Sequence, residues 1–300
     1  MPAPIIAAFD PYTADTAPIV LAVGAAELTG STVIAVAVYP WSLADEPSDL
    51  DGDPQRLVAN AMREVHDEFG VDTQIVTDLS VPRGLHLIAC AMQAGLIVVG
   101  STGRGRAGRV LVGSTAERLI QGSRCPVALA PRDYQPSGIR TIAVGFVDSP
   151  EGHEALAAAH ALAVRSEARL RILAVLHPSG GLDAATAPGL RPQRSVTLEG
   201  RHRRDAQVAL DRAVAALTPP VDVECEVHVD DPAEVLLRIS EHVDLLICGS
   251  RGYGPLRSVL LGGVSRRLVD GSHCPVLVLP RDAGRPLENL IDHAGAAAAR

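Results

Sequence analysis

The chain contains GSTGRGRAGRVLVGSTAERL at residues 100–119 and, 149 residues later, the similar stretch GSRGYGPLRSVLLGGVSRRL at residues 249–268. Each stretch reads Gly, two residues, Gly, nine residues and Gly, and then continues into a helical pattern. The Cys-Pro pair and the Pro-Arg-Asp run that follow recur at the same offset. Nearer the start, IIAAFD ending at Asp10 returns as AVGFVD ending at Asp148. The chain therefore consists of two copies of one unit.

The length agrees with this duplication, because 300 residues is about twice the length of an average domain. We predict one domain over residues 1–136, a second over residues 137–284 and a C-terminal tail over residues 285–300. With 47% hydrophobic and 21% charged residues, the chain has ordinary globular composition and can bury a core.

Composition excludes several functions. The formal net charge of −8 and the aromatic content of 3% argue against a nucleic-acid partner, which favours basic surfaces and stacking side chains. All 27 basic residues are arginines, so neither a P-loop lysine nor a Schiff-base lysine is available. The longest apolar stretches, such as residues 17–26, are about half the length needed to cross a bilayer. No basic residue precedes Arg56, so no secretory signal is expected, and we predict a cytoplasmic protein without a membrane partner.

Short apolar runs alternate with helical periodicities in both copies, which predicts an α/β fold. The runs are continuously apolar, as in strands covered on both faces, so we expect parallel sheets with helices on each side. Each copy is predicted to be a Rossmann-like domain with a five-stranded parallel sheet. The predicted strands are residues 5–9, 32–39, 71–77, 96–99 and 126–130 in the first copy, and 141–146, 170–176, 221–229, 245–248 and 276–279 in the second.

Ligands of open parallel sheets bind beyond the carboxyl ends of the strands. Asp10 and Asp148 close the first strand of each copy, and the glycine-rich stretches follow the fourth. Glycines let backbone N–H groups approach an anion closely, and a helix N-terminus adds unpaired N–H groups. Ser114 and Thr115 add hydroxyl donors at such a helix start. These features predict a cradle for a polyphosphate that requires no lysine.

Both copies resemble the universal stress protein family, whose ATP-binding members carry the motif G-2x-G-9x-G-[S/T]. The resemblance implies a tandem member with two adenine nucleotide alpha hydrolase-like domains. It places the adenosine-contacting aspartate at Asp10 and Asp148, and the strand end that meets adenine near Val38 and Val175. The implied phosphate-binding residues are Gly100, Gly103, Gly113, Ser114 and Thr115 in the first copy, and Gly249, Gly252, Gly262, Gly263 and Ser265 in the second.

One position departs from the family motif, because Gly263 stands where a Ser or Thr is expected. Loss of a hydroxyl-to-phosphate hydrogen bond costs about 1.5–3 kcal/mol, which is roughly one to two decades of affinity. Ser265, two residues later, is a candidate replacement. We therefore expect two ATP sites, of which the second is weaker.

The resemblance implies an ATP-binding regulatory module of the stress response, with adenine nucleotide as its partner and its protein partner unidentified. Two alternatives stay open: a slow ATPase on the same fold, and an interaction scaffold that binds no nucleotide. The residues assign no catalytic base, and they leave open whether Mg²⁺ accompanies ATP.

The last strand of each copy, residues 127–130 and 276–279, is expected at the edge of its sheet. Uncovered apolar edges promote association, and in the family the corresponding strands pair antiparallel across a two-fold axis. The two copies can satisfy each other in this way within one chain, giving an intramolecular pseudo-dimer. Whether two chains then form a homodimer is open.

Overall fold

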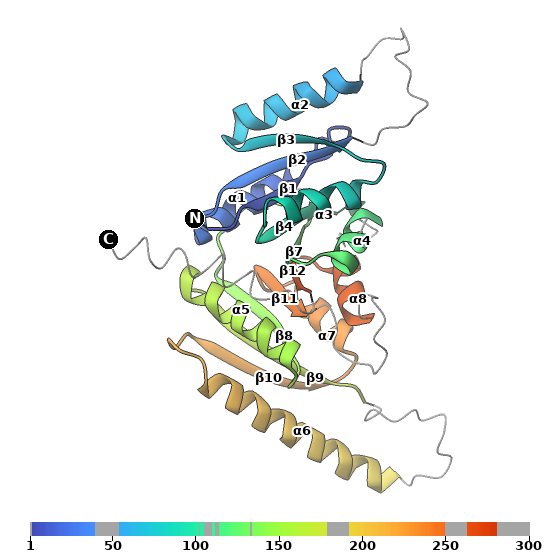
Figure 1. Cartoon of the computed structure of the whole chain (residues 1–300). Coiled ribbons are helices and arrows are strands. Elements are labelled where there is room, and N and C mark those ends of the chain that lie inside the picture. The colour runs from blue at the N-terminus through green and yellow to red at the C-terminus, as the bar shows by residue number, and fades with distance from the viewer. Residues whose placement is uncertain are drawn as a thin grey trace.

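A computed structural model describes residues 2–39, 54–101, 103–104, 110–111, 114–132, 134–178, 192–249 and 263–280. Figure 1 shows the two halves of the chain one above the other, with the strands β7 and β12 at their junction. The helices α2 and α6 lie at opposite ends of the molecule.

The first half alternates strands and helices as its periodicities predict. The α1 helix has a proline in its first turn and ends at Gly30, whose φ of 68° is left-handed and whose N–H donates to the carbonyl of Ala26. The elements are β1 (Ile5–Ala8), α1 (Ala17–Thr29), β2 (Val33–Tyr39), α2 (Pro54–Phe69), β3 (Asp72–Thr77), α3 (Val81–Ala91), β4 (Leu96–Gly100), β5 (Gly103–Arg104), β6 (Val110–Leu111), α4 (Ser114–Gly122) and β7 (Val127–Ala130).

The second half repeats this order. Its helix α7 is capped by Asp231, whose carboxylate accepts from the backbone N–H groups of Ala233 and Glu234. The elements are β8 (Thr141–Phe146), α5 (Pro150–Ser166), β9 (Arg169–Leu176), α6 (Pro192–Ala215), β10 (Val223–Val229), α7 (Pro232–Ile239), β11 (Leu245–Gly249), α8 (Gly263–Gly271) and β12 (Val276–Leu279).

The ten long strands form one sheet in the order β10-β9-β8-β11-β12-β7-β4-β1-β2-β3. Within this sheet, the five strands of each half pair in parallel, which confirms the predicted five-stranded parallel sheets. Among the strand pairs of this sheet, only β12 and β7, which join the two halves, are antiparallel. Leu277 lies opposite Ala128 in this pair. The two edge strands thus cover each other within the chain, as the pseudo-dimer predicts.

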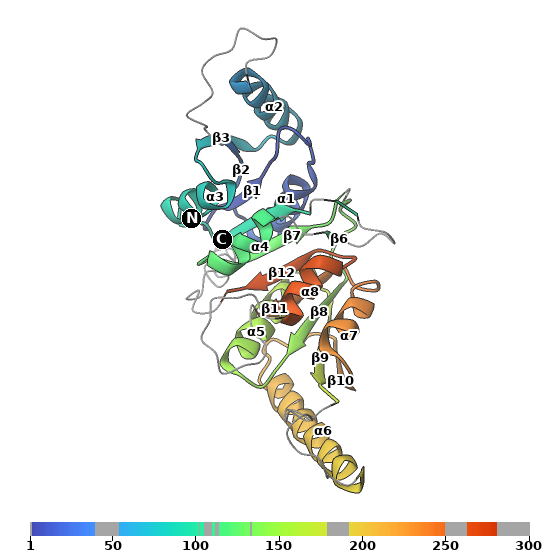
Figure 2. The ribbon, with the colours of Figure 1, turned by 90° about the vertical axis from the view of Figure 1, so that its right-hand side faces the viewer.

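Helices cover both faces of the sheet, so strand side chains alternate between two cores. The core on one face contains Ile5 and Ala7 of β1 and residues of α1, α2, α5 and α6. The core on the other face contains Ile6 and residues of α3, α4, α7 and α8. Figure 2 shows α4 and α8 on the same side of the sheet, near the junction of the halves.

The glycine-rich stretch of the first half differs from expectation. Where the sequence predicted only a backbone cradle, β5 and β6 form a short antiparallel pair, with Gly103 opposite Leu111 and Arg104 opposite Val110. The predicted site residues Gly113, Gly252 and Gly262 lie outside the described residues, as does the predicted tail. The domain limits stay predictions. No described helix is both long and apolar enough to cross a membrane.

Candidate functional site

A cavity of about 300 Å³ lies in the first half, at the carboxyl ends of β1, β2 and β4 and beside the start of α4. This is the place where open parallel sheets bind ligands. The structure brings four predicted site residues together around it: Asp10 after β1, Val38 on β2, Gly100 at the end of β4 and Thr115 in the first turn of α4. The residues expected to meet a nucleoside and those expected to meet its phosphates therefore share one cavity.

Asp10 is held by the turn that it begins. Its Oδ1 accepts from the N–H of Tyr12 at 3.0 Å, and its carbonyl accepts from the N–H groups of Thr13 and Ala14. The residue is exposed, and its Oδ2 accepts no hydrogen bond within the described part of the chain. This carboxylate is thus oriented by the backbone and keeps acceptor capacity for a hydroxyl group.

Gly100 packs closely against the start of α1. A Cβ atom at this position would lie 3.2 Å from Cγ of Pro18 and 3.3 Å from Oδ2 of Asp15. Oδ1 of Asp15 also accepts from the backbone N–H of Ala17, the first residue of α1, at 3.0 Å. The sequence assigned no role to Asp15. The structure adds it to the cavity as an acidic group next to a predicted phosphate-binding glycine.

Arg132 is a second residue that sequence reasoning missed. It lines the cavity after β7, and its backbone N–H donates to Oγ of the buried Ser101 at 3.0 Å. The Pro-Arg-Asp run containing it marked the repeat in the sequence but was assigned no role. The arginine brings a cation to a cavity where a polyphosphate is predicted.

Two further predicted residues of the first half are described by the structure, one on the β5–β6 pair and one on α4. Gly103 is in β5, and Ser114 is the first residue of α4. The start of α4 provides unpaired backbone N–H groups and the positive end of the helix dipole, which favour an anion.

The second half has two smaller spaces where the first half has one cavity. A space of about 60 Å³ is lined by Gly249, Val175 and Ser265, and one of about 280 Å³ by Asp148, Val175 and other residues of β8, β9 and α6. Gly263 is the first residue of α8. Asp148 and Gly249 therefore line different spaces, while Val175 lines both.

The earlier start of α5 accounts for part of this difference. α5 begins at Pro150, two residues after Asp148, whereas α1 begins at Ala17, seven residues after the equivalent Asp10. Oγ of Ser149 caps α5 by accepting from the N–H of Gly152 at 3.1 Å. A Cβ atom on Gly152 would lie 1.9 Å from the carbonyl oxygen of Val147, so only glycine fits this extra turn.

Polar groups of the second site are bonded to one another. Nε2 of His153 lies 2.9 Å from Oδ1 of Asp148, and the His153 ring packs edge-on against Phe146. Oγ of the buried Ser265 donates to the carbonyl of Gly249 at 2.7 Å. A phosphate at this place would have to compete with that carbonyl for the Ser265 hydroxyl. Burial raises the pKa of the nearby Cys248 thiol to about 12, which excludes a thiolate nucleophile at neutral pH.

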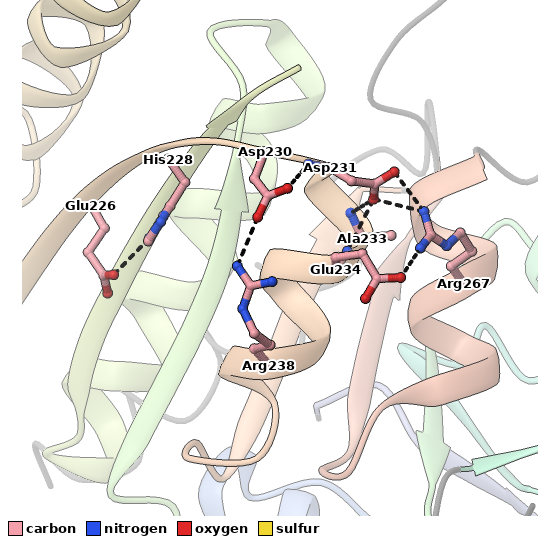
Figure 3. A network of polar contacts seen from close by, with 8 residues as sticks. All are labelled: Glu226, His228, Asp230, Asp231, Ala233, Glu234, Arg238 and Arg267. Carbon is pink, nitrogen blue, oxygen red and sulfur yellow. Dashed lines mark hydrogen bonds and ion pairs between the residues drawn. The ribbon is translucent and has the colours of Figure 1, made fainter. Parts of the chain in front are cut away.

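An ion-pair cluster joins α8 to the start of α7 (Figure 3). The guanidinium of Arg267 donates to both carboxylate oxygens of Asp231, at 2.7 Å and 2.9 Å, and pairs with Glu234. Burial pushes the pKa of Asp231 upward, but the N–H of Glu234 and the Arg267 guanidinium outweigh it and hold the pKa below its ordinary value. Arg238 binds Asp230 beside it, at 3.1 Å. The cluster fixes α8, the helix expected to receive phosphate in this half.

A metal site built by protein side chains is not found in the described part of the chain, where no three His, Cys, Asp or Glu side chains gather to hold an ion. The buried thiols of Cys125 and Cys274 have raised pKa values because of desolvation, and for Cys274 the value is about 12. They are packing groups rather than reactive ones.

The chain is similar to known proteins in both sequence and fold. A model of the universal stress protein family matches residues 1–131 and 138–280. A universal stress protein from Mycobacterium tuberculosis is 28% identical over 267 residues, which cover 84% of this chain and 86% of that protein. A universal stress protein from Mycolicibacterium smegmatis is 31% identical over 229 residues, which cover 75% of this chain and 74% of that protein. The crystal structure of a universal stress protein from Archaeoglobus fulgidus matches with a TM-score of 0.67 at 19% identity, over 94% of this chain and 99% of that one.

Proposed function

Because the chain belongs to the universal stress protein family, we propose that it is an ATP-binding regulatory protein whose first half holds the nucleotide. The observation that carries this proposal is the single cavity of about 300 Å³ that Asp10, Val38, Gly100 and Thr115 share. Its volume lies at the lower end of the range for small-molecule sites.

Each part of ATP has a complementary group in this cavity. The adenine ring is assigned to the apolar end of β2 near Val38, and a ribose hydroxyl to the open oxygen of Asp10. The phosphates are assigned to Gly100, to the start of α4 with Thr115, and to Arg132. The motif residues Gly103, Gly113 and Ser114 belong to the same proposed phosphate site. No lysine is needed, because backbone N–H groups and an arginine supply the positive field.

Mg²⁺ is part of this proposal because of Asp15. Its Oδ2 is 3.3 Å from the Cβ position of Gly100, so a bare triphosphate at this glycine would meet a carboxylate. Mg²⁺ prefers carboxylate and phosphate oxygens and neutralises the charge between them. We assign Asp15 as the group that makes ATP binding depend on Mg²⁺.

The second half is proposed as a weaker site. Gly263 and Val264 replace Ser114 and Thr115 at the helix start, and the cavity is divided. This site is proposed to bind ATP only at higher concentration than the first half does. The residues assigned to it are Asp148, Val175, Gly249, Gly252, Gly262, Gly263 and Ser265.

The two alternative functions differ from this proposal in what the purified protein contains and does. Acid extraction of the protein, followed by chromatography of the supernatant, identifies any bound adenine nucleotide. ATP without steady turnover supports the binding module. ADP with continuous phosphate release supports the slow ATPase. No nucleotide, together with no heat of binding at millimolar ATP, supports the nucleotide-free scaffold and overturns the proposal. A cytoplasmic location is proposed on the same basis, since ATP is abundant there.

A further inference from the structure

The two halves meet along an approximate two-fold axis. Ala128 of β7 lies directly opposite Leu277 of β12, and these residues are equivalent in the repeat, since they differ by the same 149 residues as Gly100 and Gly249. Residues that lie next to a two-fold axis meet their own counterparts, whereas residues farther from it meet non-equivalent ones. A junction between two identical halves would therefore place identical side chains against each other near the axis.

The side chains at one such position are oppositely charged. Nε of Arg266 on α8 lies 3.6 Å from Oε1 of Glu117 on α4. These two residues also differ by 149, so they are counterparts in the repeat. The contact crosses the junction on the face of the sheet that carries α4 and α8 (Figure 2).

A second contact of the same kind lies on the opposite face of the sheet. Nε of Arg165 on α5 donates to the carbonyl of Leu28 on α1 at 2.5 Å. The helices end at Gly30 and Glu167, which are both left-handed and both donate to a carbonyl four residues back. That alignment makes Leu28 and Arg165 counterparts as well. On both faces an arginine of the second half meets an acceptor of the first.

The local cost of Arg266 indicates that its role lies across the junction. It stands in the first turn of α8, where the positive end of the helix dipole disfavours a cation. Glu117 occupies the equivalent place in α4, where the dipole favours an acid. Nothing within α8 therefore favours an arginine at position 266. The ion pair with Glu117 across the junction does favour it.

We propose that this junction is a selective surface, on which each half accepts the other half and rejects its own kind. Pairing of two first halves would bring two Glu117 side chains together. Pairing of two second halves would bring together two Arg266 and two Arg165 side chains. The partner that fits the first half is thus a second half, from the same chain or from a copy that exchanges halves with it.

Charge reversal in the full chain reproduces both forbidden junctions. Glu117→Arg places two arginines across the axis, as in a pair of second halves, and Arg266→Glu places two glutamates there, as in a pair of first halves. The double variant Glu117→Arg/Arg266→Glu restores opposite charges in swapped order. In the double variant, the unfavourable interaction of the new arginine with the α4 dipole is offset by the favourable interaction of the new glutamate with the α8 dipole. The measurement is the thermal midpoint of all four proteins by circular dichroism.

The expected order of midpoints is wild type and double variant together, then Arg266→Glu, then Glu117→Arg, which suffers both repulsion and an unfavourable dipole. For a chain of this size the largest drop should be about 2–4 °C. The differences should shrink in 1 M NaCl, where charges are screened over about 3 Å. Glu68→Arg, an equal charge change on the exposed face of α2, is the control and should leave the midpoint in place.

A double variant whose midpoint drops by the sum of the two single drops would overturn the proposal, because the residues would then not be coupled. If a single reversal prevents folding while the double variant folds, the proposal is supported. If neither single reversal folds, the same comparison is made with Glu117→Gln, Arg266→Gln and the double variant. A drop in the midpoint of the double variant equal to the sum of the two single drops would again overturn the proposal.

Discussion

Nε2 of His153 lies 2.9 Å from Oδ1 of Asp148, whereas Oδ1 of Asp10, the equivalent residue of the first half, accepts from the backbone N–H of Tyr12 and from no side chain among the described residues. The same carboxylate is therefore engaged by a side chain in one half and available in the other. This difference, together with the divided cavity, is the structural basis for expecting unequal sites.

Replacing His153 by alanine should strengthen ATP binding to the second half, because it frees Asp148 for a ribose hydroxyl. The affinity for ATP is expected to rise about threefold to tenfold. This is the free energy of one hydrogen bond to a charged group, reduced by the cost of desolvating that group. Isothermal titration is done in an Asp10→Ala/Gly100→Ala background, in which both changes weaken the first site, so that the second site contributes most of the binding. Adding Asp148→Ala to this variant is the control and should cancel the gain; a gain that persists would mean that His153 acts in another way.

Asp15→Asn should change how ATP binding depends on Mg²⁺. The wild-type protein is expected to bind Mg²⁺–ATP at least tenfold more tightly than ATP in EDTA, since a carboxylate next to Gly100 repels free phosphate. The amide removes this repulsion and should bring the two affinities together. Equal affinities with and without Mg²⁺ in the wild type would contradict the assignment of Asp15.

Gly100→Ala should weaken ATP binding by about tenfold or more, because a methyl group there meets Pro18 and Asp15 and blocks close approach of phosphate. The matched control is Gly122→Ala on the last turn of α4, where a methyl group meets nothing within 4 Å. Nucleotide titration and thermal unfolding of both variants separate the effects. Loss of binding in both variants, or in neither, would show that Gly100 does not contact the ligand.

Asp231→Asn should make the protein less sensitive to acid. The folded-state pKa of Asp231 lies below the ordinary value near 3.9, so its charge stabilises the fold above about pH 4 and this contribution is lost as the pH falls through the folded-state pKa. Asparagine keeps the helix cap but cannot titrate. Between pH 4 and pH 2, urea unfolding should show a shallower pH dependence for the variant. Asp67→Asn on the exposed face of α2 is the control, and an identical slope for all three proteins would refute the account.

The sequence predicted the fold well because the apolar runs are continuous and the repeat is regular. The junction of β7 and β12 was also predictable, since Val127–Ala130 and Val276–Leu279 are too apolar to stay uncovered. The β5–β6 pair was not, because the glycine-rich stretch has no alternation of polar and apolar residues.

Several features of the site depended on contacts that no local pattern encodes. Asp15 lies at the cavity because Gly100 packs against the start of α1. Arg132 lies there because its backbone N–H donates a hydrogen bond to Ser101. The earlier start of α5 had a signal, since Ser149 followed by Pro150 is typical of a helix N-terminus. Its consequence for the cavity depends on the backbone of Val147, which only the structure shows.

The most direct test of unequal sites is calorimetric titration of Mg²⁺–ATP into the wild-type protein, Asp10→Ala and Asp148→Ala. We predict that Asp10→Ala lowers the affinity of the tighter site by about tenfold or more, as expected for loss of a hydrogen bond to a charged group. Asp148→Ala should leave that site unchanged. A larger loss from Asp148→Ala, or equal losses from both substitutions, would contradict the claim that the first half holds the nucleotide.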